Sequence, residues 1–173
     1  MDSDSSLLID ALRTMYLRDL RATDAEVAAY PDEASLWLIA PGISNPAGTL
    51  AIHIAGNLRH FVGGMIGKTG YIRDRDAEFN ARNVPREKIR ADIATAIDEV
   101  MSTLDRLTDV DMAKEFPIPV GQAKTRVRTS DWLVHLATHL TYHLGQIDYH
   151  RRLLTPNPVS VDNLSLLELA SKQ

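Results

Sequence analysis

Four long segments of the chain repeat apolar residues at the period of an α-helix, and prolines or glycines lie between them. This pattern predicts helices over about residues 5–30, 46–66, 85–107 and 130–154, joined by connections of unequal length. Each helix has one apolar stripe, which is most simply buried against the stripes of the other three. The sequence therefore predicts an all-α fold, a four-helix bundle.

Residue types at the helix ends support these boundaries. Asn45, directly before a proline, is typical of an N-cap, and Ser130 is predicted to cap the last helix. The segment 31–50 contains three prolines and two glycines. We expect mostly connecting chain there, which brings Trp37 and Leu38 to the core as a lid.

Three shorter regions depart from the long helices. The polar stretch 71–84 is predicted to be a loop or a short helical turn. Between Phe116 and Val127, two short extended runs flank a Gly-Gln pair, so we expect a small hairpin or an irregular excursion between the third and fourth helices. The tail beyond Leu154 is short and is predicted to form a terminal helical turn against the bundle.

Length and charge limit the classes of function. A chain of 173 residues with 45% apolar composition suits a single domain, which we expect to span 1–173. The net charge of −4 and the lack of a long basic stretch argue against nucleic acid as a partner. No apolar run approaches the roughly 20 residues of a membrane-spanning helix, and the acidic start differs from a signal peptide, so we expect a cytoplasmic protein without a membrane partner. Cysteine is absent, so a bound transition metal must use nitrogen or oxygen ligands.

The last predicted helix carries histidines at intervals of four residues, His135, His139 and His143. Residues four apart lie about 6 Å along the axis and about 40° around it, so neighbouring rings can close on one divalent cation. Two imidazoles leave a metal underbound, whereas a third nitrogen from another helix completes the three-ligand set of catalytic zinc sites. The sequence therefore predicts a metal site between this helix and the histidine-bearing helix 46–66.

The second helix offers two histidines as the third ligand, His53 and His60, which share one face with Asn57. Spacing alone leaves them as rivals. His53 lies between two isoleucines early in the helix, whereas His60 adjoins an arginine near the glycine-rich end, where a cationic ring would interact favourably with the helix dipole. This context favours His53. Clustering and apolar flanks likewise favour ligands over solvated surface histidines for His139 and His143.

Other polar residues on these faces are candidates for the surroundings of the metal. Asn57, one turn beyond His53, is predicted to hold the metal-bound water or a substrate group, although an ordinary polar position explains it equally well. Gln146 and His135 are predicted to support the ligands or to contact the substrate. His150 lies about 22 Å along the helix axis from His135, so it cannot share the ion and is expected to be a packing residue.

The stretch 71–84 interleaves arginines with carboxylates, and its most simple interpretation is a solvated loop of mutual ion pairs. The alternative is that one arginine reaches the metal cleft and binds an anionic substrate. The residues concerned are Arg73, Asp74, Arg75, Asp76, Glu78 and Arg82.

Three segments carry a resemblance to a known family: PGISNPAGTLAIHIAGNLRHFVGG, GYIRDRDAEF and LVHLATHLTYHLGQIDYHRRLL. In pattern the chain resembles the DinB-like superfamily, the damage-inducible and YfiT-like metalloproteins, over about Ser5 to Leu154. The resemblance implies an up-down-down-up four-helix bundle, often a homodimer, in which three histidines bind a divalent metal such as zinc or nickel. Carried over by motif, these ligands correspond to His53, His139 and His143.

The resemblance implies the chemistry only broadly. Characterised members include thiol-dependent transferases and isomerases that use bacillithiol, mycothiol or glutathione, and metal-dependent hydrolases are proposed. A metal with three neutral ligands is a strong Lewis acid, which can activate water or hold a small thiol as its thiolate. No carboxylate lies within one helical turn of the predicted ligands except Asp148, and the lack of a general base favours thiol transfer over hydrolysis. A non-catalytic, metal-binding stress-response dimer is the remaining alternative.

Overall fold

The computed structural model of the chain describes residues 4–116, 125–159 and 161. The four long helices are α1 (Asp4–Ala28), α2 (Ala47–Leu58), α4 (Arg86–Leu104) and α6 (Thr129–Leu154). α2 continues directly into a π-helix, η2 (Arg59–Ile66). The all-α fold is confirmed, and the observed helix ends, with η2 counted as part of the second helix, lie within three residues of the predicted ones. Across these described ranges, no helix is both long enough and apolar enough to cross a membrane.

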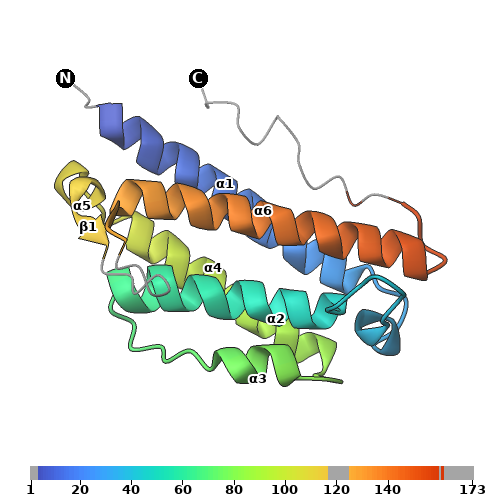
Figure 1. Cartoon of the computed structure of the whole chain (residues 1–173). Coiled ribbons are helices and arrows are strands. Elements are labelled where there is room, and N and C mark those ends of the chain that lie inside the picture. The colour runs from blue at the N-terminus through green and yellow to red at the C-terminus, as the bar shows by residue number, and fades with distance from the viewer. Residues whose placement is uncertain (1–3, 117–124, 160, 162–173) are drawn as a thin grey trace.

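The long helices form an up-down-down-up bundle, as Figure 1 shows. α1 and α6 run in one direction, and α2 and α4 run in the opposite direction. α1 packs against α4 and α6, and α2 packs against the same two helices. Because α2 and α4 are parallel, the chain must return along the bundle between them, and this return carries α3 (Arg75–Asn80), which packs on α2.

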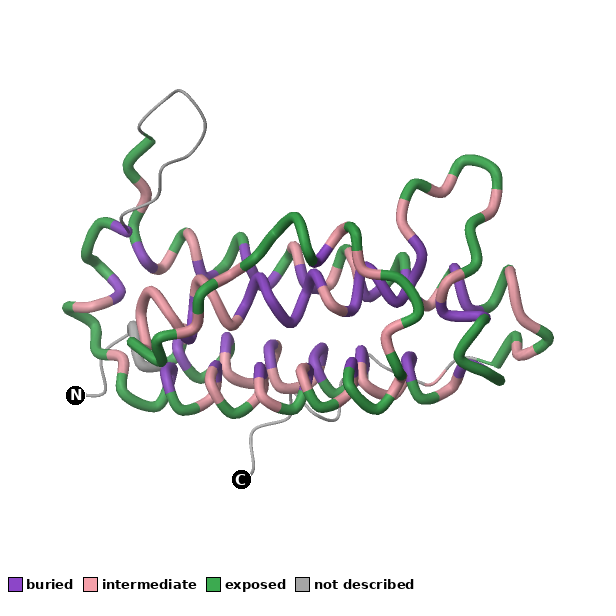
Figure 2. Tube along the Cα trace, turned by 90° about the horizontal axis from the view of Figure 1, so that it is seen from below, coloured by how far each residue is buried: buried purple, intermediate pink, exposed green. Residues whose placement is uncertain are grey.

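The apolar stripes meet in one core, and Figure 2 shows the buried positions facing the space between the helices. On α4 the predicted apolar face is inside, with Ile89, Ile93 and Val100 fully buried. On α6 the leucines and isoleucine that flank the histidines are buried as well. Burying them fixes the rotation of α6 about its axis, so that the histidine stripe lies at the edge facing α2. These residues are Leu136, Leu140, Leu144 and Ile147.

The connection between α1 and α2 differs in detail from the prediction. A 3-10 helix, η1 (Ala34–Trp37), buries Leu36 completely, whereas Leu38 is 44% exposed. Trp37 packs on the core while partly exposed, and its ring lies over Gly48, where an added Cβ would come within 2.8 Å of the ring. Leu36 and Trp37 therefore cover this end of the core, and the prediction for Leu38 is wrong.

Two predicted helix caps are displaced. The N-cap of α2 is Pro46 rather than Asn45, and the N-cap of α6 is Arg128 rather than Ser130. Neither cap residue makes a side-chain hydrogen bond to its helix. Thr129, the first residue of α6, instead donates its N–H and its hydroxyl to the backbone carbonyl oxygen of Lys114 in the preceding excursion. That tertiary contact takes over the role expected of a local cap.

The excursion between α4 and α6 contains a helix that the sequence pattern did not predict, α5 (Asp109–Ala113), which begins with a capping box. β1 (Glu115–Phe116) and β2 (Val127–Arg128) then pair antiparallel, as expected for the ends of a hairpin. The tip of the predicted hairpin, 117–124, lies outside the described residues. The predicted helical turn of the tail falls mostly on 162–173, which also lie outside them.

Candidate metal centre

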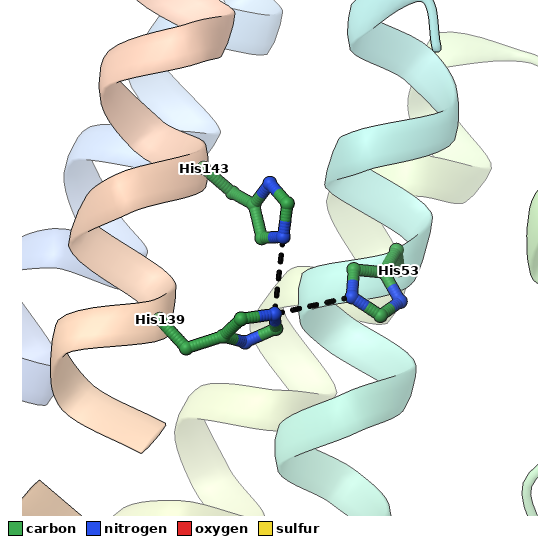
Figure 3. A group of neighbouring side chains, drawn as sticks. All are labelled: His53, His139 and His143. Atoms are coloured by element: carbon green, nitrogen blue, oxygen red, sulfur yellow. Dashed lines mark hydrogen bonds between the residues drawn. The ribbon is translucent and has the colours of Figure 1, made fainter. Parts of the chain in front are cut away.

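His53 of α2 and His139 and His143 of α6 converge at the edge between the two helices, as Figure 3 shows. Nε2 of His139 lies 3.0 Å from Nε2 of His143 and 3.4 Å from Nε2 of His53. Each ring offers one nitrogen within 4.8 Å of those of the other two. Nitrogens bound to one tetrahedral ion at 2.0–2.1 Å are about 3.3 Å apart, so this spacing fits a shared divalent cation.

The far nitrogens of two of these rings are held by hydrogen-bond acceptors. Nδ1 of His53 lies 3.1 Å from Oε2 of Glu78, and Nδ1 of His143 lies 2.7 Å from Oε1 of Gln146. Because carboxylate and amide oxygens accept, Nδ1 donates in both rings and Nε2 keeps its lone pair. Both lone pairs are therefore available on the side that faces His139.

Glu78 is a buried carboxylate that reaches the histidine group from α3. Glu78 is 4% exposed. Arg73 donates to both of its carboxylate oxygens, from Nε at 2.7 Å and from Nη2 at 2.6 Å. Nη2 of Arg73 also lies 3.0 Å from Nδ1 of His53, because the two donors share Oε2 as acceptor. Burial raises the pKa of Glu78, but the hydrogen bonds from Arg73 and His53 outweigh burial and leave the pKa below its usual value. Glu78 is thus an anion that orients the His53 ring.

A glycine makes room for this carboxylate on α2. Gly56 lies three residues after His53, and an added Cβ there would overlap Oε1 of Glu78. α3 is fixed at its start by Asp74, whose side chain accepts a hydrogen bond of 2.9 Å from the backbone N–H of Ala77. The placement of Glu78 therefore depends on a gap in one helix and a cap on another.

The sequence interpretation of 71–84 as a solvated loop is wrong for Arg73 and Glu78, whose side chains are only 10% and 5% exposed. The alternative, that an arginine reaches the cleft and binds an anionic substrate, is closer to the structure. Arg73 does reach His53, but its guanidinium is paired with Glu78. Two signals pointed to Glu78. One is Gly56, which weakens a helix interior without any local reason. The other is the segment GYIRDRDAEF, which contains Glu78 and carries part of the family resemblance.

Burial keeps the two α6 histidines uncharged at neutral pH. Burial, followed by the neighbouring histidines, lowers the pKa of His139 to about 4. Burial also lowers the pKa of His143, although its hydrogen bond to Gln146 acts in the opposite direction. Metal binding requires the unprotonated ring, so both side chains are in the ligand form without first releasing a proton.

The structure places two more predicted residues next to the group. Gln146 contacts His143 as described above, from an exposed position one turn further along α6. His135 is exposed, and its ring stacks between those of Trp132 and His139, with centroid distances of 4.9 Å and 6.3 Å. His135 thus flanks the group and is not among the three converging nitrogens.

On α2, Asn57 is 7% exposed, and its Oδ1 has no hydrogen-bond partner within the described part of the chain. A buried amide oxygen in this state is available to a bound molecule or water. His60, the rival of His53, is not part of the group. Seven residues of helix separate the two histidines by about 10 Å along the axis, and the His60 ring packs against Phe61.

The far end of α6 is occupied by packing contacts. Nδ1 of His150 lies 2.8 Å from the Tyr30 hydroxyl, and Nε2 lies 2.8 Å from the carbonyl oxygen of Leu38. His150 is therefore a buried packing residue. Asp148 hydrogen-bonds the two arginines that follow it on α6, so its carboxylate is engaged away from the three histidines.

These features define a class of protein: an up-down-down-up helical bundle with a three-histidine group between α2 and α6 that can hold a metal ion. A family model of the DinB superfamily matches residues 10–147, a range that includes all three histidines and Glu78. The chain belongs to the DinB superfamily. A search of curated proteins gave no match.

Proposed function

We propose that the protein is a metal-dependent enzyme that transfers a low-molecular-weight thiol to an electrophilic small molecule. His53, His139 and His143 are the proposed ligands, and zinc or nickel is the proposed ion. The observation that carries the proposal is the convergence of three Nε2 atoms, two of which, in His53 and His143, keep their lone pairs because Nδ1 donates. A divalent cation bound there by three neutral rings would keep its full charge and would stabilise a thiolate.

The surrounding residues hold the ligands rather than move protons. Glu78 and Gln146 fix the ring orientations of His53 and His143 through their Nδ1 atoms. Both oxygens of Glu78 already accept hydrogen bonds, so this carboxylate is not free to deprotonate a substrate. Thiol transfer needs no such base when the thiol is already ionised. This supports thiol transfer over the alternative, hydrolysis.

Two further residues are proposed to contact the substrate. The buried amide of Asn57 would bind a polar group next to His53, since its Oδ1 lacks a partner in the described residues. His135, stacked between Trp132 and His139, would contact the substrate beside the three histidines.

Metal content tests the ligand assignment. Purified protein loaded with zinc should hold about one ion per chain by elemental analysis, and His139→Ala should hold none. His135→Ala is the matched control on the same helix and should keep the ion. Stoichiometric zinc in the His139→Ala protein would contradict the assignment.

Turnover assays test the reaction. Metal-loaded protein is incubated with bacillithiol, mycothiol or glutathione and an uncharged aryl electrophile, in parallel with simple esters and amides. Thioether formation that requires both metal and protein supports the proposal. Ester or amide cleavage without a thiol would favour the hydrolase. A metal that only raises the melting temperature would favour the stress-response protein in which the ion ties α2 to α6.

We propose a homodimer of single-domain chains spanning 1–173, located in the cytoplasm. Light scattering of the purified protein gives the mass in solution and tests the dimer, and a monomeric mass at micromolar concentration would contradict it.

A further inference from the structure

A pocket of about 480 Å³ lies between the connection that precedes α2 and the C-terminal half of α6. His143 forms part of its wall, and so does Gln146, whose side chain hydrogen-bonds His143. A molecule in this pocket would therefore lie next to the candidate metal centre. The volume is in the usual range for sites that bind small molecules.

The lining of the pocket is mostly apolar and carries no formal charge. Among the described residues that form it, none is a lysine, an arginine, an aspartate or a glutamate. Side-chain amides come from Asn45 and Gln146, and apolar surface comes from Leu50 and Leu153. An ionic group in the pocket would lose hydration without gaining an opposite charge from the lining, whereas a neutral group with hydrogen-bonding atoms would be matched. Arg152, whose guanidinium lies 5.7 Å from the centre of the Tyr149 ring, already pairs with Asp148.

Two tyrosines of α6 stand at this pocket with much of their surface in solvent. Tyr142 and Tyr149 are seven residues apart, so they share one helix face, and each is 65% exposed. The Tyr142 ring also contacts the His143 ring, with centroids 5.3 Å apart. Two exposed aromatic rings beside apolar side chains can cover a flat ring in edge or stacked contacts. This favours a planar, partly apolar occupant over a flexible polar one.

We propose that this pocket binds the uncharged aromatic part of the electrophilic substrate and so sets its reactive end beside His143. Asn45 and Gln146 supply the hydrogen bonds, and Tyr142 and Tyr149 supply the ring contacts. The role of the occupant as a substrate rests on the proposed thiol transfer. The preference for an uncharged aromatic group rests on the pocket alone.

Three probes of similar size and different charge test the preference: benzamide, benzoate and benzylamine. Binding is followed by ligand-observed NMR on metal-free protein, so that a carboxylate or an amine cannot bind through an ion. Benzamide should bind about tenfold or more tightly than either charged probe. Equal or tighter binding of a charged probe would overturn the proposal, as would the absence of benzamide binding.

Substitutions locate the binding. Leu153→Asp adds a carboxylate to a position that is 70% exposed, so the fold is preserved, and it should improve benzylamine binding about fivefold. Leu7→Asp, at a leucine on α1 that is 66% exposed and not part of the pocket, should change nothing. Tyr149→Ala should weaken benzamide binding up to about tenfold. Identical effects of Leu153→Asp and Leu7→Asp would overturn the location.

The two proposals can fail separately. His139→Ala should lose zinc and keep benzamide binding if both hold. Wild-type protein without zinc or thiol transfer, but with benzamide binding that responds to Leu153→Asp, would refute only the proposed function. Zinc-dependent thiol transfer with no such benzamide binding would refute only the pocket.

Discussion

At the scale of single residues, the candidate metal centre depends on Glu78 as well as on the histidines. Glu78→Gln keeps the shape of the side chain and removes its charge. We expect zinc affinity to fall roughly 10–100-fold, because Nδ1 of His53 loses its charged acceptor and Arg73 loses its partner. Isothermal titration with zinc measures the change. Asp76→Asn, at an exposed carboxylate on the same helix, is the control, and a Gln variant as tight as the wild type would contradict the role of Glu78.

Two glycines give a second residue-scale test. Alanine has a higher helix propensity than glycine by about 1 kcal/mol, so exposed helical glycines usually gain stability from the change. Gly145→Ala on α6 meets no atom within 4 Å and should stabilise the protein by about 0.5–1 kcal/mol. Gly56→Ala overlaps Glu78 and should lower both the melting temperature and the zinc affinity. A stabilised Gly56→Ala protein with unchanged zinc affinity would show that Glu78 does not need this gap.

The residues of the centre differ in how far sequence could predict them. The closeness of His139 and His143 follows from helix geometry, which is local. Choosing His53 over His60 needed burial context and the family resemblance. Glu78 comes from 25 residues away, on a short helix whose docking is a tertiary contact, so spacing along the chain carried no information about it.

At the scale of elements, the sequence located the long helices because prolines and glycines interrupt helices locally. It did not distinguish η2 from an α-helix, since the wider turn depends on packing. Two glycines of η2 and its C-terminal end allow close approach to α4. An added Cβ at Gly63 would come within 2.6 Å of Oε2 of Glu99, and one at Gly67 would overlap Oγ1 of Thr103.

His150 links α6 to the connection before α2, and this link should be sensitive to pH. Burial lowers the pKa of His150 from its usual 6.5, although the hydrogen bond to Leu38 opposes the shift. The folded state therefore takes up a proton less readily than the unfolded state. Stability is full above pH 6.5 and decreases as the pH falls below that value.

The pH dependence can be assigned to this residue by comparison with a variant. Between pH 7 and pH 5, thermal melts of metal-free protein should show a larger loss of melting temperature for the wild type than for His150→Gln. The other histidines contribute equally to both proteins. If the melting temperatures of the two proteins fell equally with pH, the assignment to His150 would be contradicted.

At the scale of the whole molecule, a buried ion pair joins the first and last helices. Arg151 is fully buried and donates to Glu26 of α1 from Nε at 2.6 Å and from Nη2 at 3.2 Å. It also donates to the carbonyl oxygens of Asn157 and Val159 beyond the helix, at 2.9 Å each. One side chain thus holds three segments of the chain together.

Removing this guanidinium should affect global stability. Arg151→Met takes away the charge that compensates buried Glu26, and we expect a loss of roughly 3–5 kcal/mol in the free energy of unfolding. Urea denaturation measures it. Arg152→Met, at the exposed neighbour, should change stability by no more than about 0.5 kcal/mol. Similar losses in both variants would show that the buried pair contributes nothing specific.

The overall architecture was predictable to the level of a helical bundle, because apolar periodicity alone requires four faces to be buried. Helix directions were not available from periodicity. They came from the family resemblance. In the structure, the long return between α2 and α4 is what allows these two helices to run in the same direction. The preference for burying Leu36 over Leu38 was also beyond the pattern, since both positions are equally apolar in sequence.

The attachment of α3 has one more consequence. A helix of six residues has little stability in isolation, so its docking relies on contacts with α2, such as the hydrogen bond between Glu78 and His53. An ion that fixes His53 would also favour the docked helix, and by thermodynamic reciprocity the docked helix would favour retention of the ion by the same factor. The segment Arg75–Asn80 would then act as a latch, and the protection of its amides from deuterium exchange would report whether the centre is filled.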